Sequence, residues 1–314
     1  MADLFDRRDL KLASLAGRCS RVGPDGLWRS WAGHDIRDFA ASMPDTLAAH
    51  SLREVASAVV KARRDGSPRI LMYGGHVIKC GMGPLLCDWA ARGLLSCLAT
   101  NGSGSIHDLE MALFGQTSED VEAGLADGSF GMWEETLRIY AEAVDRAEEE
   151  SAGLGAALGD MILERGGDPL VSPLAACRSA GIPLTVHPAL GTDIVHPSPR
   201  LDWGRLGRAS ERDFDILGSQ VAGLEGGVVL NAGSAVVMPE VFLKLLSCAR
   251  NLGAPVGGFL AANFDMIQHY RPTQNVLSRP ASALGGRGLA VTGHHEVMLP
   301  LLDLFMRIAE EEDR

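Results

Sequence analysis

The sequence predicts an α/β fold built on a doubly wound, mostly parallel sheet. Six apolar runs break off into glycine and polar residues, and they span residues 70–76, 94–108, 182–193, 226–234, 257–265 and 288–295. Short apolar segments that alternate with helical patterns are typical of parallel crossover units. In such sheets, ligands bind in the crevice beyond the carboxyl ends of the strands. We therefore expect the polar residues that follow the runs to form a single site.

Helical patterns separate the apolar runs. Apolar spacing predicts helices over residues 46–64, 82–92, 106–114, 210–222 and 239–251, and a final helix that ends in EEEDR. Residues 130–165 also favour helix, with an acidic run followed by a stretch of small residues. The chain shows no repeat or linker. We expect an N-terminal helical arm over residues 1–66 and one α/β catalytic domain over residues 67–314.

Composition excludes several classes of protein. With 314 residues, the chain is long enough for a large core. Its net charge of −11 argues against a nucleic-acid partner, because phosphate binding needs a basic surface. The six cysteines are spread singly, which favours reduced thiols. Without an apolar signal segment or a run of about 20 apolar residues, we expect a cytoplasmic protein that does not bind membranes.

The segment NGSGSIHDLE (101–110) is the strongest candidate for a functional site. Its glycines would let backbone amides approach a ligand, and the helix that follows would offer its N-terminus to a phosphate. Three polar residues are expected in the first turn of that helix: His107, Asp108 and Glu110. A glycine-rich turn with capping acids is the simpler interpretation. The segment matches neither the GxGxxG pattern nor the Walker pattern.

Two further segments carry candidate residues. GGHVIKCGMGP (74–84) places His76 and Lys79 about one helical turn apart, and a desolvated Lys79 would be an amine nucleophile. A surface lysine is the simpler interpretation. HPALGTDIVHP (187–197) is flanked by prolines and holds His187 and Asp193, which is typical of an ordered functional loop.

Histidines and carboxylates near the C-terminus invite a zinc hypothesis. These residues are Asp265, His269, His294, His295 and Glu296. None of the histidine pairs has the HxxxH or HExxH spacing of helical zinc sites. We therefore predict no metal site and expect the histidines to serve as acid–base or hydrogen-bonding groups. A histidine-ligated metal hydrolase is a weaker alternative.

Side by side, these segments resemble the deoxyhypusine synthase family and its Rossmann-like, NAD/FAD-binding-like fold. The likeness covers most of residues 45–305 and is carried by GGHVIKCG, ATNGSGSIHDLEMALFG, HPALGTD, VVLNAGSAV, LAANFD and TGHHEVMLPLL. The resemblance implies NAD bound across the strand ends and transient hydride abstraction from an amine. It also implies a homo-oligomer, a dimer or a tetramer, with sites at dimer interfaces.

The resemblance also implies which residues contact the cofactor and the substrate. The expected cofactor-binding residues are Gly74, Gly75, His76, Asn101, Gly102, Ser103, Gly104, Asp193, Asn231, Gly233, Ser234, Asp265 and His295. Together with the candidates found in the segments themselves, the expected catalytic residues are Lys79, His107, Asp108, Glu110, His187 and His294. Among these, Asp108 would face the substrate amine.

One departure from the family changes the expected reaction. The family's catalytic lysine lies in a Trp-Gly-Lys segment, and here that region reads SALGGRG (282–288). True deoxyhypusine synthesis is therefore not expected. Because residues 101–110 are also similar to archaeal-type NAD-dependent ornithine cyclodeaminases, we expect an NAD-dependent lyase or transferase that acts on a small amine or amino acid. The alternatives are a homospermidine-type (polyamine) aminobutyl transferase that uses Lys79, and a non-catalytic nucleotide-binding protein.

Overall fold

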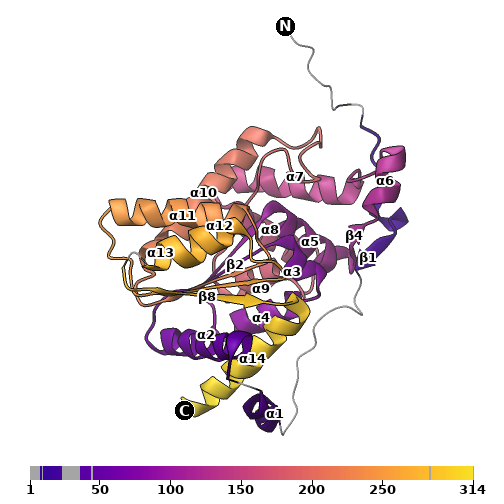
Figure 1. The fold of residues 1–314 in the computed structure, drawn as a ribbon. Helices are drawn as coiled ribbons and strands as arrows, with labels where there is room; N and C mark the ends of the chain where they lie inside the picture. Colours follow the sequence, from indigo (N-terminus) through magenta and orange to yellow (C-terminus); the bar gives the residue numbers. More distant parts are fainter. Residues whose placement is uncertain (1–7, 9, 23–35, 44, 283, 314) are drawn as a thin grey trace.

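The predicted fold class is confirmed. The structure is a computed structural model that describes residues 8, 10–22, 36–43, 45–282 and 284–313, so residues 1–7, 9, 23–35 and 44 of the predicted arm lie outside the described residues. It contains a six-stranded parallel sheet with helices on both faces (Figure 1). None of the helices in these ranges has the length and apolar character needed to span a membrane.

The strands of the main sheet are the six apolar runs. They are β2 (Arg69–Tyr73), β3 (Cys97–Asn101), β5 (Leu184–His187), β6 (Val228–Ala232), β7 (Leu260–Asp265) and β8 (Arg287–Thr292). Their order across the sheet is β5-β3-β2-β6-β7-β8, and every neighbouring pair is parallel. The winding direction therefore reverses between β2 and β6, and ligands bind at such switch points in doubly wound sheets.

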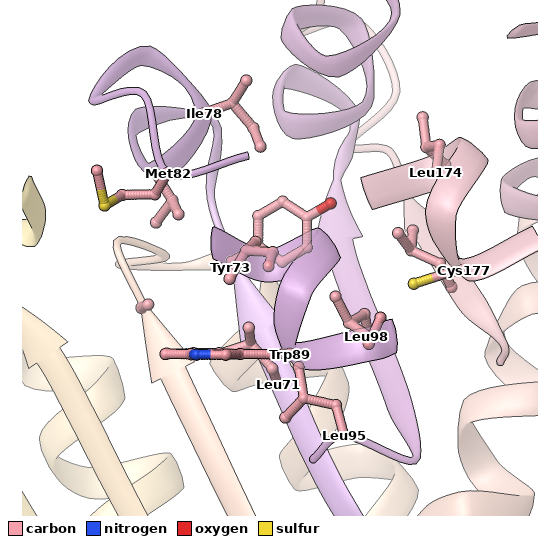
Figure 2. Packing of buried hydrophobic residues seen from close by; sticks show 14 of the residues in the cluster. Leu71, Tyr73, Ile78, Met82, Trp89, Leu95, Leu98, Leu174 and Cys177 are labelled. Atoms are coloured by element: carbon pink, nitrogen blue, oxygen red, sulfur yellow. The ribbon is translucent and has the colours of Figure 1, made fainter. Parts of the chain in front are cut away.

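Alternate residues of each strand face two different cores. In β2, Leu71 and Tyr73 belong to the larger core, whereas Ile70 and Met72 face the smaller one. Figure 2 shows the Tyr73 ring in the larger core, with Ile78 on one side of it and Trp89 on the other. Because helices cover both faces of the sheet, the inner strands are mostly apolar instead of alternating with polar residues, whereas the edge strand β8 is largely exposed.

The helices pack in these two cores, and α10 (Trp203–Ala222) contributes to both. The larger core takes most of its helical side chains from α2 (Leu47–Arg64), α3 (Gly75–Lys79), α4 (Gly83–Ala91), α5 (Gly102–Phe114), α7 (Glu134–Glu149), α8 (Leu154–Glu164), α9 (Pro173–Ala180) and α14 (His295–Glu312). The smaller core takes them from α10 (Trp203–Ala222), α11 (Val237–Asn251) and the π-helical segment η3 (Thr273–Ser278). The short helices are η1 (Leu15–Gly17), α1 (Ile36–Ser42), α6 (Val121–Asp127), α12 (Tyr270–Pro272) and α13 (Arg279–Ser282).

Helix α5 begins earlier than the sequence predicts. Asn101 caps it by accepting a hydrogen bond from the Gly104 amide at 3.0 Å, so the helix starts at Gly102. The prediction that His107, Asp108 and Glu110 lie in the first turn is therefore wrong, and these residues occupy the second and third turns. The glycine- and serine-rich stretch is itself helical.

Two further segments differ from the prediction. Residues 130–165, predicted to favour helix, contain the two helices α7 and α8, and the break between them, which the sequence does not predict, includes Ser151 in a left-handed conformation with φ of 53°. The sequence also does not predict the two-stranded antiparallel sheet of β1 (Ser20–Val22) and β4 (Thr117–Glu119). Helix α2, from the predicted arm, packs in the larger core. The domain boundary at residue 66 stays a prediction.

Gly155 is expected to be intolerant of any side chain. A Cβ at this position would overlap the carbonyl oxygen of Leu184 in β5 and would lie 2.8 Å from its carbonyl carbon. Because these are backbone atoms that cannot rotate away, Gly155→Ala should lower the free energy of unfolding by about 2 kcal/mol or more. Gly207→Ala in α10 is the matched control, because nothing lies within 4 Å of a Cβ there. Urea unfolding should show it unchanged or more stable by up to about 1 kcal/mol; equal stabilities would contradict this packing argument.

Candidate active site

A polar cavity of about 160 Å³ lies beside α5, near the carboxyl ends of the strands. It brings together five residues that the sequence predicts for the site: Lys79, Ser103, His107, Glu110 and Asp193. Its lining also contains residues that sequence reasoning missed, which are Arg18, Ser118, Glu119 and Thr192. Since ligand pockets usually span about 300–1,000 Å³, this cavity suits a small molecule or one part of a larger ligand.

Glu110 anchors one wall of the cavity. Its carboxylate forms a two-pronged ion pair with the Arg18 guanidinium, with N–O distances of 2.9 and 3.1 Å. The Thr136 hydroxyl donates to Oε1 at 2.9 Å, and the Thr117 hydroxyl donates to Oε2 at 2.5 Å. These four bonds occupy both oxygens of a fully buried carboxylate. Glu110 therefore acts on the cavity mainly by holding Arg18 and Thr117.

The same hydrogen bonds determine the tautomer of His107. Its Nδ1 lies 2.7 Å from the Thr117 hydroxyl oxygen. Because the Thr117 proton goes to Glu110, which can only accept as a carboxylate, the hydroxyl oxygen must accept a proton from Nδ1. The lone pair is therefore on Nε2. Burial lowers the pKa of His107 to about 3, helped by the positive charges of Lys79 and Arg18, so the imidazole is neutral near pH 7.

Groups of opposite charge also line the cavity. Burial lowers the pKa of Lys79, whereas the charges of Glu110 and Glu119 raise it. Burial raises the pKa of Asp193 to about 6. The buried Oδ2 of Asp193 accepts no hydrogen bond from the described residues and lies 3.7 Å from His196 Nε2. A cationic ligand group at this oxygen would offset the cost of burying it.

The predicted cofactor glycines are in close contact with the protein itself. A Cβ on Gly74 would lie 2.9 Å from the Gly233 carbonyl carbon, and one on Gly75 would lie 2.6 Å from Ser103 Oγ. A Cβ on Gly102 would lie 2.6 Å from the Asp193 carboxyl carbon. Backbone packing therefore requires glycine at position 74, whereas at positions 75 and 102 the nearest atoms belong to the side chains of Ser103 and Asp193. Contact between these glycines and a cofactor stays a prediction.

Polar groups at the switch point fit a dinucleotide. Asn231 Nδ2, at the end of β6, donates to the Ser234 carbonyl at 3.0 Å and to Asn263 Oδ1 at 2.7 Å. Its Oδ1 is buried and has no hydrogen-bond partner in the described part of the chain, and Asp265 is buried at the end of β7. The unpaired Oδ1 of Asn231 is an acceptor that a hydroxyl or amide donor of a ligand such as NAD would satisfy.

Three of the predicted catalytic residues do not line this cavity. Asp108 is fully buried, its Oδ2 accepts a hydrogen bond from the Leu174 amide of α9 at 2.8 Å, and burial raises its pKa to about 7. His187 Nε2 lies 2.9 Å from the Thr185 hydroxyl, and burial lowers its pKa to about 4. The exposed His294 is the N-cap residue of α14. Catalytic roles for these residues stay predictions.

The missed residues come from segments without a clear sequence pattern. Arg18 precedes Glu110 by 92 positions, and Glu119 lies on the three-residue strand β4. Glu119 accepts hydrogen bonds from the Gly131 amide at 3.1 Å and from Trp133 Nε1 at 2.7 Å. For this part of the cavity the sequence offers one signal. His107 and Glu110 are three residues apart, which places both side chains on the same face of a helix.

Comparisons with known proteins find similar structures but no similar sequence. No family model and no curated protein matches this chain. A candidate LOR/SDH protein from Methanococcus maripaludis S2 has a TM-score of 0.55 at 15% identity, covering 85% of this chain and 72% of that chain. A candidate deoxyhypusine synthase from Entamoeba histolytica has a TM-score of 0.52 at 13% identity, covering 88% of this chain and 97% of that one.

A third similar structure contains ligands. It is AgrE in a ternary complex with ornithine and NAD⁺, with a TM-score of 0.53 at 14% identity. The match covers 90% of this chain but only 35% of AgrE, so this chain corresponds to about a third of that protein. At these identities the likeness shows the fold alone, and the chain has the α/β fold that these three proteins share.

Proposed function

We propose that this chain is an NAD-dependent enzyme that acts on an amino acid or a small amine by transient hydride abstraction. The observation that carries the proposal is that Lys79 and Asp193, two groups of opposite charge, line one small cavity together with a neutral His107. An α-amino acid has one charge of each sign, so its carboxylate would pair with Lys79 and its ammonium with Asp193. The complex of AgrE with ornithine and NAD⁺, which has the same fold, supports the choice of substrate and cofactor.

The chain's own residues would perform the proton transfers. NAD⁺, held by Asn231, Asp265 and the glycine turns, would supply the hydride acceptor. His107 Nε2 would relay the proton that the substrate ammonium must lose before its carbon can become an imine, and would later relay it back; with a pKa of about 3, it would carry the proton only transiently. The hydrogen bond from Nδ1 to Thr117 keeps Nε2 unprotonated. Elimination, cyclisation or transfer would follow at the imine, which corresponds to a lyase or a transferase.

A homospermidine-type aminobutyl transferase is a second candidate because of Lys79. Burial lowers the pKa of its amine, which increases the fraction of the nucleophilic neutral form. In that reaction Lys79 would form a covalent imine with the transferred group. Borohydride trapping of a Lys79 adduct during turnover of a polyamine would favour this candidate over the amino-acid enzyme.

Calorimetry on the purified protein tests the proposed function. We expect wild-type protein to bind NAD⁺, and to bind ornithine in its presence. Asp193→Asn should weaken ornithine binding by about 10- to 100-fold, because a charge-assisted hydrogen bond contributes about 1.5–3 kcal/mol. The matched control is Asp215→Asn, at an exposed position on α10.

Two outcomes would count against the proposal. No binding of NAD⁺ at millimolar concentration would remove the cofactor and with it the hydride step. Equal ornithine affinities of the Asp193→Asn and Asp215→Asn proteins would show that the cavity does not hold the substrate ammonium.

A further inference from the structure

A second cluster of chemically active side chains lies at the end of β2, outside the cavity described above. His76 and Cys80 are four residues apart on α3 and its C-cap, with His76 Nε2 3.3 Å from Cys80 Sγ. His295, the first residue of α14, lies 220 positions further along the chain, and its ring centroid is 5.3 Å from that of His76. One ligand atom from each of the three residues lies within 4.8 Å of the others.

His295 is already oriented as a metal ligand would be. Its Nε2 lies 3.1 Å from the Phe264 carbonyl oxygen, which can only accept, so Nε2 carries the proton. The lone pair is therefore on Nδ1, which is buried and has no hydrogen-bond partner among the described residues. Metal-ligating histidines usually donate their other ring N–H to a backbone carbonyl or a carboxylate in this way.

The surrounding backbone leaves room for this ring. Gly233, at the switch point, has a φ of 62°, and a Cβ there would lie 3.1 Å from the Cε1 atom of His295. His295 is fully buried, whereas His76 is exposed, so the cluster has one fixed ligand and an open side through which an ion can enter. The Glu296 carboxylate interacts with the Cys80 thiol and is available as a fourth ligand.

We propose that His76, Cys80 and His295 bind a divalent transition-metal ion of the zinc type. Two imidazole nitrogens and one thiolate match the donor preference of Zn²⁺ and Co²⁺. A tetrahedral zinc ion holds its ligand atoms about 3.3–3.8 Å apart, so the ligand atoms, now within 4.8 Å of one another, need to approach by at most about 1.5 Å. Glu296 or water would complete the coordination. None of these three residues lines the Lys79–Asp193 cavity. Because His76 and His295 are also among the residues expected to contact NAD⁺, metal binding is tested on protein free of NAD⁺.

Cobalt binding to the full-length protein tests this site. After chelator treatment, one equivalent of Co²⁺ should bind and give a thiolate-to-cobalt absorption band, with release of the Cys80 thiol proton. The band should be lost in Cys80→Ser, and His76→Ala should weaken binding by at least about tenfold. Both positions are at least partly exposed, so these variants are expected to fold. Zn²⁺ should displace the cobalt and abolish the band.

Cys248→Ser, which removes an exposed cysteine on α11, is the matched control and should bind Co²⁺ like the wild type. Absence of a stoichiometric cobalt complex in the wild-type protein would overturn the site. So would a thiolate band that survives in Cys80→Ser. Either result would leave His76 and Cys80 as an ordinary thiol–imidazole hydrogen bond.

Discussion

Arg18→Met is expected to lower the free energy of unfolding by about 3–5 kcal/mol. The side chains of Arg18 and Glu110 are each only 1% exposed, so the substitution leaves the Glu110 carboxylate buried without its counter-charge. Methionine keeps an apolar stem of similar length, and the loss therefore measures mainly the guanidinium, which pairs with Glu110 and lies 5.7 Å from the centroid of the Trp133 ring. Urea unfolding followed by circular dichroism gives the difference between the variant and the wild type.

An exposed ion pair provides the control for this experiment. Arg63 lies 2.5 Å from Glu310, and its side chain is 43% exposed. Arg63→Met is expected to cost less than about 1 kcal/mol, because water and salt screen such pairs. Adding Glu110→Gln to Arg18→Met should recover part of the loss, since no unpaired charge is then buried. Similar losses for the Arg18 and Arg63 variants would contradict the proposed role of the buried pair.

The sheet could be predicted from the sequence because most of its strands are buried on both faces. Such burial makes a strand a continuous apolar run, as in residues 70–73 and 228–230, and polar residues follow where the strand leaves the core. The same logic identified Lys79, His107 and Asp193, which the structure brings to one cavity. The sequence therefore predicts directly at which edge of the sheet the polar side chains lie.

The contacts that organise the cavity could not be predicted. Strands β1 and β4 have only three residues each, too few to show a period of two, yet their neighbourhood supplies Arg18, Thr117 and Glu119. The start of α5 was misplaced because glycine and serine have low helix propensity, and the Asn101 cap outweighs it locally.

The sequence did not predict the cluster of His76, Cys80 and His295, for which we propose metal binding, and the physical reason is a different one. Its ligands do not share one helix or one loop: His76 and Cys80 follow β2, whereas His295 follows β8. Spacing rules for zinc sites recognise ligands that are close in sequence, and only the folded sheet brings these two segments together. The sequence did place His76 and His295 at strand ends, but the prediction of no metal site rested on the absence of zinc-type spacing and on the need for ligands from several separate loops.

His107→Ala is expected to reduce kcat by about 10²- to 10⁴-fold if the proposed hydride-transfer chemistry operates, the usual range for removal of a general base. Thr117→Val should cost less, because it leaves the imidazole but removes the acceptor that holds Nδ1–H. Steady-state turnover of the substrate identified by calorimetry, with NAD⁺ present, measures both. Thr117→Val is matched by Thr192→Val, an exposed threonine on the rim of the same cavity, which should change kcat little.

The pH dependence separates His107 from Asp193. Because the folded-state pKa of His107 is about 3, its imidazole is already neutral at pH 5, and its titration should not limit the rate near pH 6. Asp193 has a raised pKa of about 6 and must be ionised to hold an ammonium, so kcat/KM should rise as the pH increases through 6. That limb should disappear in Asp193→Asn and persist in Thr117→Val. If kcat/KM of Asp193→Asn still rises through pH 6, the titration belongs to another group. Full activity of His107→Ala would exclude Nε2 as the proton acceptor.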